Sequence, residues 1–478
     1  MKDFKEIKSI VLNSLKERIA ATKRGGWIRA GIWGTLYVIF IFWVAWGDWS
    51  SLGWLVLLPI IVDAFTTKYI KWSWWRKYKE SKPWLYKVLT WVDAIVFALV
   101  AVYFINLYIF QNYQIPSSSL EKTLLVGDFL YVDKMAYGPR VPMTPLSAPL
   151  TQHTMPSWLG GGKSYFDHPH WGYKRLHGWR QPQKGDIVVF NFPAGDTVVV
   201  GLENPDYYTL KYELKKNGNR PVKIGDVFVT SQMLQHLKVR PVDRRENYVK
   251  RCVGAAGDSL KIVDNVIYTK STEHGTQNTD WIREPEREGM QLNYEVTTDG
   301  TALSQHFLDN LGISHDDQYG ARIAKNKYIF PLTKGMKAQM EKNSHVDSVI
   351  VQNEAFGGEV YPLGHNEWTR DNYGPIYIPR KGDRILITEE NYWLYKRIAD
   401  AYEFQPMKIG EEYTFSMDYY WMMGDNRHKS ADSRYWGFVP EDHIVGRPVF
   451  IWLSIDKDKP WFKGRIRWNR IGKRVTSI

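Results

Sequence analysis

Cysteine is almost absent from this chain, since Cys252 is the single one among 478 residues. An intramolecular disulfide is therefore excluded, and the cysteine count gives no information on the redox compartment. The usual zinc sites with cysteine ligands use several thiolates, so we predict no metal site and no cofactor. Residues 265–415 also lack any internal repeat.

Acidic residues are scarce around the first apolar segments, where residues 67–87 hold a single acid, Glu80, among six lysines and one arginine. The net charge of the whole chain is +12. Because much of this basic charge flanks apolar runs near the N-terminus, we interpret it as membrane-flanking charge. We therefore expect membrane lipids as a partner and no nucleic acid.

Three apolar runs follow one another, at residues 30–47, 49–62 and 88–110. The first and third are close to the roughly 20 residues that a helix needs to cross a bilayer, whereas the second is marginal. The first run starts too late for a cleaved signal peptide and lacks a small-residue cleavage site. We predict a cytoplasmic basic segment at 1–26 and a membrane anchor at 27–110 with two or three transmembrane helices. Because basic segments stay cytoplasmic, the loop 67–87 places everything after Phe110 outside.

The pattern changes after about residue 112 to short alternating runs separated by turn residues, for example at 129–133, 186–190 and 259–264. This alternation predicts short β-strands, and the Pro-, Gly- and His-rich stretch 139–179 predicts a long irregular loop. We predict a mainly β catalytic domain made of residues 111–264 and 416–478. Residues 265–415 are expected to form a large inserted β-rich lobe.

Three consecutive serines, Ser117 to Ser119, follow the last apolar run almost directly. In an extended segment, Ser117 and Ser119 would point to the same face. One hydroxyl could then attack a carbonyl while the other helps to hold the oxyanion. On its own, such a cluster is more often a polar turn.

Four segments, in this order, resemble the sequence boxes of type I signal peptidases, which are Ser/Lys proteases. They are residues 114–138, 183–193, 248–258 and 424–447. The last of them is the most specific, and all four follow an N-terminal anchor. The resemblance implies a barrel-like, coiled β-sheet as the fold of the catalytic domain.

The resemblance also implies a role for individual side chains. Ser119 would be the nucleophile, Lys250 the general base, Ser117 an oxyanion-hole donor and Ser430 the group that orients the lysine amine. Asp432 and Arg434 would support the last box. A lysine is a poor base at its ordinary pKa, so Lys250 must be buried to lose its proton near neutral pH. The tight turn 424–426 would bring Ser430 near Lys250.

The chain departs from the common family pattern at positions that remove no catalytic group. They are Ser118, Leu120, Lys122, Ala256, His428 and Lys429.

The family reads small side chains at positions −1 and −3 before the cut, as in Ala-x-Ala. An extended substrate could add as a strand between residues 113–116 and 188–192. Apolar residues beside these segments are candidates for the two pocket walls: Tyr113, Ile115, Pro116, Leu120, Leu124, Val189, Tyr248 and Val249.

We therefore expect a multi-pass serine endopeptidase of the bacterial cytoplasmic membrane, with its catalytic domain on the outer, periplasmic side. It would remove signal peptides from exported precursor proteins, which are its expected partners. The oligomeric state and the role of 265–415 do not follow from the sequence.

Other interpretations remain open. The chain could be an inactive membrane-bound relative that binds peptides, although both Ser119 and Lys250 are present. A self-cleaving Ser/Lys protein of the repressor type agrees less well with three apolar runs. A Ser-His-Asp triad would have to use the histidines of the loop 139–179, and none of them falls in a matched box.

Overall fold

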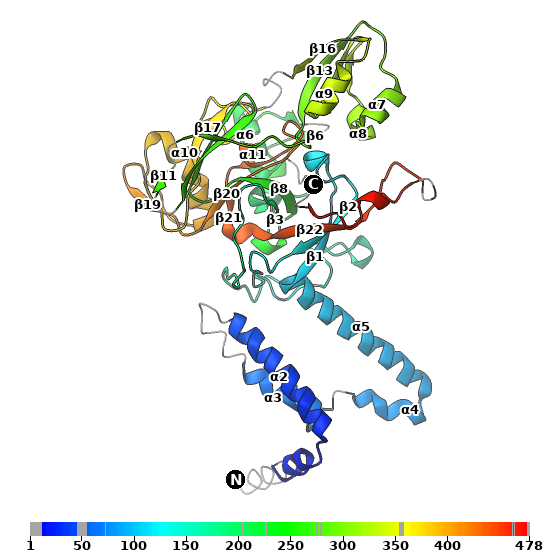
Figure 1. Ribbon diagram of the computed structural model, residues 1–478. Helices are drawn as coiled ribbons and strands as arrows, with labels where there is room; N and C mark the ends of the chain where they lie inside the picture. Colours follow the sequence, from blue (N-terminus) through cyan, green and yellow to red (C-terminus); the bar gives the residue numbers. More distant parts are fainter. Residues whose placement is uncertain are drawn as a thin grey trace. The chain divides into compact units, whose positions relative to one another are not determined.

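A computed structural model of the chain describes residues 12–44, 55–71, 73–202, 205–224, 227–273, 276–277, 280–352, 358–460, 462 and 464–475. The chain divides into two compact units, Met1–Ile105 and Asn106–Ile478. The first unit is helical, whereas the second is mainly β (Figure 1).

Two helices of the N-terminal part, α2 and α5, are long and apolar enough to cross a membrane. Their large apolar side chains are mostly exposed, as expected for helices that face lipid. A proline at the start of α5 favours helix initiation, because its missing N–H would have no partner there. The described helices of this part include α2 (Arg24–Val44), α3 (Leu58–Phe65), α4 (Tyr78–Ser81) and α5 (Pro83–Tyr108).

The long helices expected at 30–47 and 88–110 are confirmed, but their bounds differ. Helix α2 already begins at Arg24, and residues 45–47 lie outside the described part. Phe110 opens the first strand instead of closing α5, because its backbone pairs with Asp133. The middle run forms only a shorter apolar helix, Leu55–Phe65, which includes Asp63; residues 49–54 are not described.

A seven-stranded antiparallel sheet forms the centre of the second unit and curls into a half-barrel. Strands expected at 129–133 and 186–190 are found as β2 and β3. Burial alternates along β2, whereas every residue of β3 is buried. In spatial order the strands are β1 (Phe110–Gln114), β2 (Asp128–Asp133), β22 (Ile444–Ser454), β3 (Ile187–Asn191), β8 (Asn247–Gly254), β20 (Tyr419–Met423) and β21 (Val439–Pro440).

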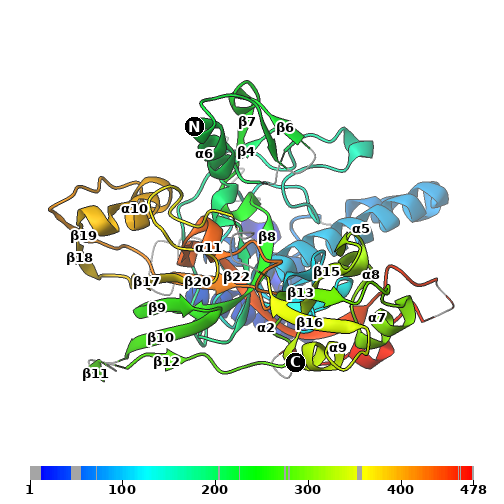
Figure 2. The same ribbon diagram turned by 90° about the horizontal axis from the view of Figure 1, so that it is seen from above.

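Additional sheets surround this central sheet, as Figure 2 shows. The strand expected at 259–264 is found as β9. One sheet contains β9 (Asp258–Val263), β10 (Val266–Glu273), β11 (Thr276–Gln277), β12 (Ile282–Arg283) and β17 (Tyr373–Tyr377), and another contains β13 (Leu292–Thr298), β14 (Arg322–Ala324), β15 (Lys327–Leu332) and β16 (Val346–Val351). Three two-stranded sheets pair β4 (Thr197–Val199) with β7 (Leu237–Val239), β5 (Val222–Ile224) with β6 (Val227–Val229), and β18 (Arg384–Leu386) with β19 (Glu412–Thr414).

Short helices cover the β13–β16 sheet and enclose a core that includes Val296, Phe330 and Met340. Most of the short helices in the second unit start at a serine, threonine or aspartate whose side chain accepts a backbone N–H, as at Asp206 and Thr388. These helices are α6 (Tyr207–Lys216), α7 (Gln305–Leu311), α8 (His315–Gln318), α9 (Lys334–Met340), α10 (Glu389–Arg397) and α11 (Ser433–Trp436).

Candidate active site

Ser119 lies in a 3-10 turn, Ser118–Leu120, directly after β1. Its side chain is buried, and its Oγ accepts a hydrogen bond from Lys250 Nζ at 2.5 Å. The expectation that Ser117 and Ser119 point to one face of an extended segment is wrong, because the chain leaves the β conformation after Ser117. Ser117 is extended and exposed, while Ser119 turns inward.

Lys250 sits in the interior of the central sheet, on β8, where its backbone pairs with Val188 of β3. Its side chain is only 5% exposed. Burial disfavours the ammonium and lowers the pKa of Lys250 to about 8, although the carboxylate of Asp432 opposes this shift. A substantial fraction of the amine is therefore neutral near physiological pH and can accept a proton.

Alternation along β8 places the neighbouring Arg251 on the opposite face of the strand. Arg251 is nevertheless as buried as Lys250. Its guanidinium binds both carboxylate oxygens of Asp425, with Nε–Oδ1 at 2.7 Å and Nη2–Oδ2 at 2.6 Å. Burial opposes ionisation of Asp425, but these bonds keep its pKa below the ordinary value. Thr123 donates a third bond to the same carboxylate at 2.7 Å.

The loop 424–434 closes over the Ser119 turn. The backbone N–H of Asn426 donates to the carbonyl of Ser119 at 3.0 Å, and the Asn426 side-chain amide donates to Ser118 O at 3.3 Å. A β-carbon on Gly424 would lie 2.4 Å from Ser430 Oγ and 2.6 Å from Ser119 O. Glycine is thus the residue that lets these two segments approach each other.

Asp432 and Arg434 form a buried ion pair next to Lys250. Both guanidinium–carboxylate bonds measure 2.9 Å, and the pair is almost fully shielded from solvent. Burial raises the pKa of Asp432, but Arg434 outweighs this effect and keeps the carboxyl ionised. The Asp432 carboxylate also accepts the N–H of Gly424 at 3.2 Å, which ties the two ends of the loop together.

The structure brings Ser119 and Lys250 into contact, but it joins neither Ser117 nor Ser430 to them by a side-chain hydrogen bond among the described residues. The Ser430 hydroxyl donates to the carbonyl of Ala431 at 3.4 Å. Its position beside Gly424 nevertheless places it close to the backbone of Ser119.

Most of the predicted pocket residues gather in one apolar cluster beside the Ser119 turn. Tyr248 differs, since its ring stacks on Phe192 with centroids 4.5 Å apart, and Pro116 is exposed. The cluster contains Ile115, Leu120, Leu124 and Val189 as buried members and Tyr113 and Val249 at its edge.

The sequence indicated neither Arg251 nor Thr123 as part of the site. The only available signals were an arginine next to the candidate base and a threonine close to the serine cluster. Asp425 had been assigned to a turn, whereas its carboxylate binds both side chains.

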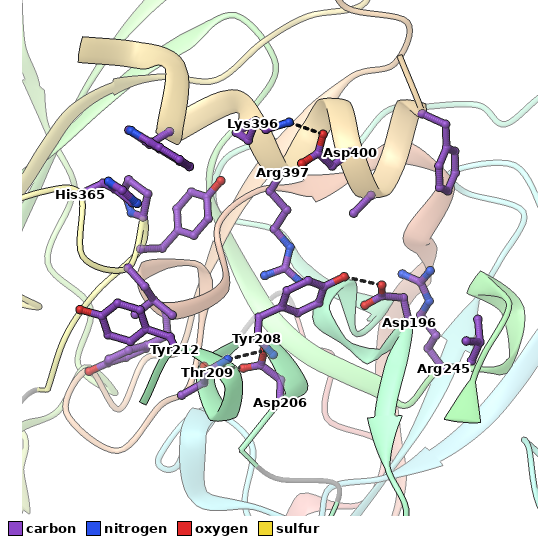
Figure 3. A pocket seen from close by; sticks show the side chains of 18 of the residues that line it. Asp196, Asp206, Tyr208, Thr209, Tyr212, Arg245, His365, Lys396, Arg397 and Asp400 are labelled. Atoms are coloured by element: carbon purple, nitrogen blue, oxygen red, sulfur yellow. Dashed lines mark hydrogen bonds and ion pairs between the residues drawn. The ribbon is translucent and has the colours of Figure 1, made fainter. Parts of the chain in front are cut away.

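Among the described residues of the second unit, the pair His443–Asp442 does not form a triad with a serine. His443 contacts Asp442, but its other ring nitrogen faces Arg245 at 2.6 Å instead of a serine. The described residues contain no group of histidine, cysteine and carboxylate side chains that could hold a metal ion. A cavity of about 480 Å³ lies elsewhere, between α6 and α10, and is lined by Tyr208 and Arg397 among others (Figure 3).

The family model described as signal peptidase, peptidase S26, matches residues 88–328 and 375–453. The chain belongs to this signal peptidase family. The first matched range includes Ser119 and Lys250, and the second includes the whole loop 424–434.

Curated signal peptidases are similar to this chain over most of its length. Signal peptidase I of Buchnera aphidicola subsp. Acyrthosiphon pisum is 26% identical over 373 residues, which cover 78% of this chain and 77% of the relative. Signal peptidase I of Haemophilus influenzae is 25% identical over 78% of this chain and 71% of its own length. A Helicobacter pylori signal peptidase I is 22% identical over 81% of this chain and 92% of its own length. The chain is accordingly a peptidase of the signal peptidase I type.

Proposed function

We propose that this signal peptidase removes N-terminal signal peptides from exported precursors by a Ser119–Lys250 acyl-enzyme mechanism, cutting after small residues as in Ala-x-Ala. The hydrogen bond from Lys250 Nζ to Ser119 Oγ at 2.5 Å is the observation that carries this proposal. A serine hydroxyl needs a base to become a nucleophile, and a buried amine at this distance, with its pKa lowered to about 8, supplies one in its neutral form.

The chemistry divides into two steps. Ser119 Oγ attacks the scissile carbonyl carbon while Lys250 takes its proton, and the proton then passes to the leaving amine as the peptide bond breaks. Water next attacks the resulting ester, with Lys250 again as base, and releases the signal peptide with a free carboxylate. The Ser117 hydroxyl and the Ser119 backbone N–H would hold the oxyanion, and Ser430 would orient the amine.

The substrate would bind as an additional strand of the central sheet. Strand β1 is at the edge of the central sheet, so an extended substrate could pair with its free side and pass the segment 188–192. The side chains at −1 and −3 would then point into the apolar cluster around Ile115 and Val189. Because most members of this cluster are buried, we expect only small side chains to fit beside them.

Substrate size at −1 tests this proposal. The purified full-length chain should cut an Ala-x-Ala precursor at one site, and Phe at −1 should lower kcat/KM by at least about 10²-fold through steric overlap. Cleavage products identified by mass spectrometry provide the measurement, with Ser119→Ala as the inactive control. Equal cleavage of the Ala and Phe precursors would contradict the pocket. If the Ser119→Ala variant cleaved as well as the wild type, the nucleophile would be another residue.

Replacing the oxyanion donor should slow turnover without loss of binding. Ser117→Ala is expected to lower kcat by roughly 10²–10³ with a nearly unchanged KM, the usual effect of losing one such donor. Ser117 is exposed, so the variant should fold normally. A wild-type kcat in this variant would show that Ser117 has a structural role in the turn and does not stabilise the oxyanion.

The proposed location is the bacterial cytoplasmic membrane, with the second unit on the outer side. Basic residues at 67–87 favour the cytoplasm for the segment between α2 and α5. In intact spheroplasts, a protease added from outside should cleave after Phe110 and leave 67–87 intact. Digestion of 67–87 alone would place the catalytic residues on the wrong side for translocated clients.

A further inference from the structure

Three consecutive residues of the loop 424–434, Arg427 to Lys429, reach away from Ser119 toward the segment 265–371. His428 and Lys429 are also two of the positions at which this chain departs from the common family pattern. Part of their binding surface lies in residues 329–374, between the two ranges matched by the family model.

His428 is held by hydrogen bonds at both ring nitrogens. Its Nδ1 accepts the backbone N–H of Asn293 at 3.1 Å, so this nitrogen carries no proton. The proton must then be on Nε2, which faces Asn265 Oδ1 at 2.8 Å and Asp371 Oδ1 at 3.0 Å. The side chain is fully shielded from solvent, and Asp371 is 5% exposed. A neutral imidazole of one tautomer is the side chain that satisfies a donor and an acceptor at these two places.

The residues on either side of His428, Arg427 and Lys429, also bind this segment. Arg427 Nη2 binds Glu284 Oε2 at 2.9 Å, and Lys429 Nζ binds Asp317 at 2.6 Å. The main chain pairs as well, because Gln291 N–H donates to Asp425 O and Arg427 N–H donates to Gln291 O, both at 2.9 Å.

The other end of the loop is fixed in the same way. Arg434, which binds Asp432 beside Lys250, also donates from Nη1 to the carbonyl of Arg370 at 3.2 Å. Arg370 directly precedes Asp371, the partner of His428. One short stretch of the segment therefore contacts the loop on both sides of Ser430.

We propose that the described residues of the segment 265–371 clamp the loop 424–434 and that His428 is a positioning residue, which keeps Ser430 and Asp432 in register with Lys250. The proposal rests on the proposed function of Ser119 and Lys250. His428 does not touch the reacting atoms, but Asn426, two residues earlier, binds the Ser119 carbonyl. A displaced loop would move both the Ser119 turn and the Asp432–Arg434 pair.

Three variants of His428 separate positioning from simple packing. His428→Ala removes the hydrogen bonds at both ring nitrogens and should lower kcat by about 10–100-fold with less than about a threefold change in KM, since small misplacements act on turnover. His428→Gln keeps a donor for Asp371 and His428→Asn keeps an acceptor for Asn293, so each should restore part of kcat. Lys327→Ala is the matched control, because Lys327 lies in the same segment and pairs with Glu295 instead of the loop.

The pH dependence of kcat/KM gives a second readout. Lys250 faces Asp432, Arg434 and Asp425, all of which belong to the loop. If the loop loosens and water enters, burial no longer disfavours the ammonium as strongly. The midpoint of the pH profile should then move to higher pH in His428→Ala and stay in place in Lys327→Ala.

The outcomes are distinguishable. A reduced kcat with a shifted midpoint and partial rescue supports the clamp. An unchanged kcat and midpoint in all three variants would overturn it, as would a loss of activity that only follows the unfolded fraction measured by circular dichroism. If the wild type cleaves no faster than Ser119→Ala, the proposed function fails instead.

Discussion

Lys250→Ala should reduce signal-peptide cleavage by roughly 10⁴-fold or more, because the Ser119 hydroxyl would have no base. In the wild type, the amine accepts a proton only when it is neutral. Since the pKa of Lys250 is about 8, kcat/KM should rise with pH up to this value and level off above it. Below it, the neutral fraction falls about tenfold per pH unit. The measurement is a pH–rate profile on an Ala-x-Ala precursor.

The appropriate control distinguishes loss of the base from loss of the fold. Lys250→Met fills the same buried space without a titratable group, so it should be as inactive as Lys250→Ala and remain folded. Lys250→His should recover little activity, because imidazole is shorter and rigid. Substantial cleavage by Lys250→Ala would show that another residue is the base.

Gly424→Ala should lower kcat by about 10²-fold or more, although it adds a single methyl group. The new carbon would overlap Ser430 Oγ and the carbonyl of Ser119, and the latter is backbone that cannot rotate away. The Ser119 turn and the loop would have to separate, which misplaces the nucleophile relative to Lys250. We also expect a stability loss of about 1–3 kcal/mol from overpacking.

Steady-state kinetics and thermal unfolding together check this prediction. Gly172→Ala is a suitable control, because its added β-carbon would meet no atom within 4 Å. The prediction fails if Gly424→Ala retains wild-type kcat, since the turn and the loop would then tolerate a wider spacing than the structure shows.

The sequence predicted the elements that depend on local patterns. The length of the apolar runs identified α2 and α5, and the alternation of residue types identified β2, β3 and β9. Both properties can be seen in consecutive residues of the sequence. The bounds of α5 were less accurate, since Phe110 is apolar enough for a helix but is drawn into β1 by its pairing with Asp133. Composition also gave no sign of the helices α7 to α10 within the region 265–415.

Prediction of the site from the sequence was limited in the same way, because its contacts join residues far apart in the chain. The Ser119–Lys250 pair was inferred by resemblance, since nothing local to either residue reveals a partner 131 positions away. The Arg251–Asp425 pair depends on the tertiary fold and could not be anticipated from spacing. The alternation argument for Ser117 and Ser119 failed because the backbone leaves the extended conformation after Ser117 and forms a 3-10 turn at Ser118–Leu120.

If Ser119 is the nucleophile, as proposed, its contacts with the loop 424–434 determine when the enzyme becomes active during its own synthesis. Asn426 binds a residue 308 positions earlier in the chain. A nascent chain exposes the serine long before the ribosome has made the loop that positions it. Under the proposed mechanism, proteolytic competence is therefore acquired late, after most of the second unit has been synthesised. A growing polypeptide would thus be protected from premature attack by its own serine without needing a separate inhibitory propeptide.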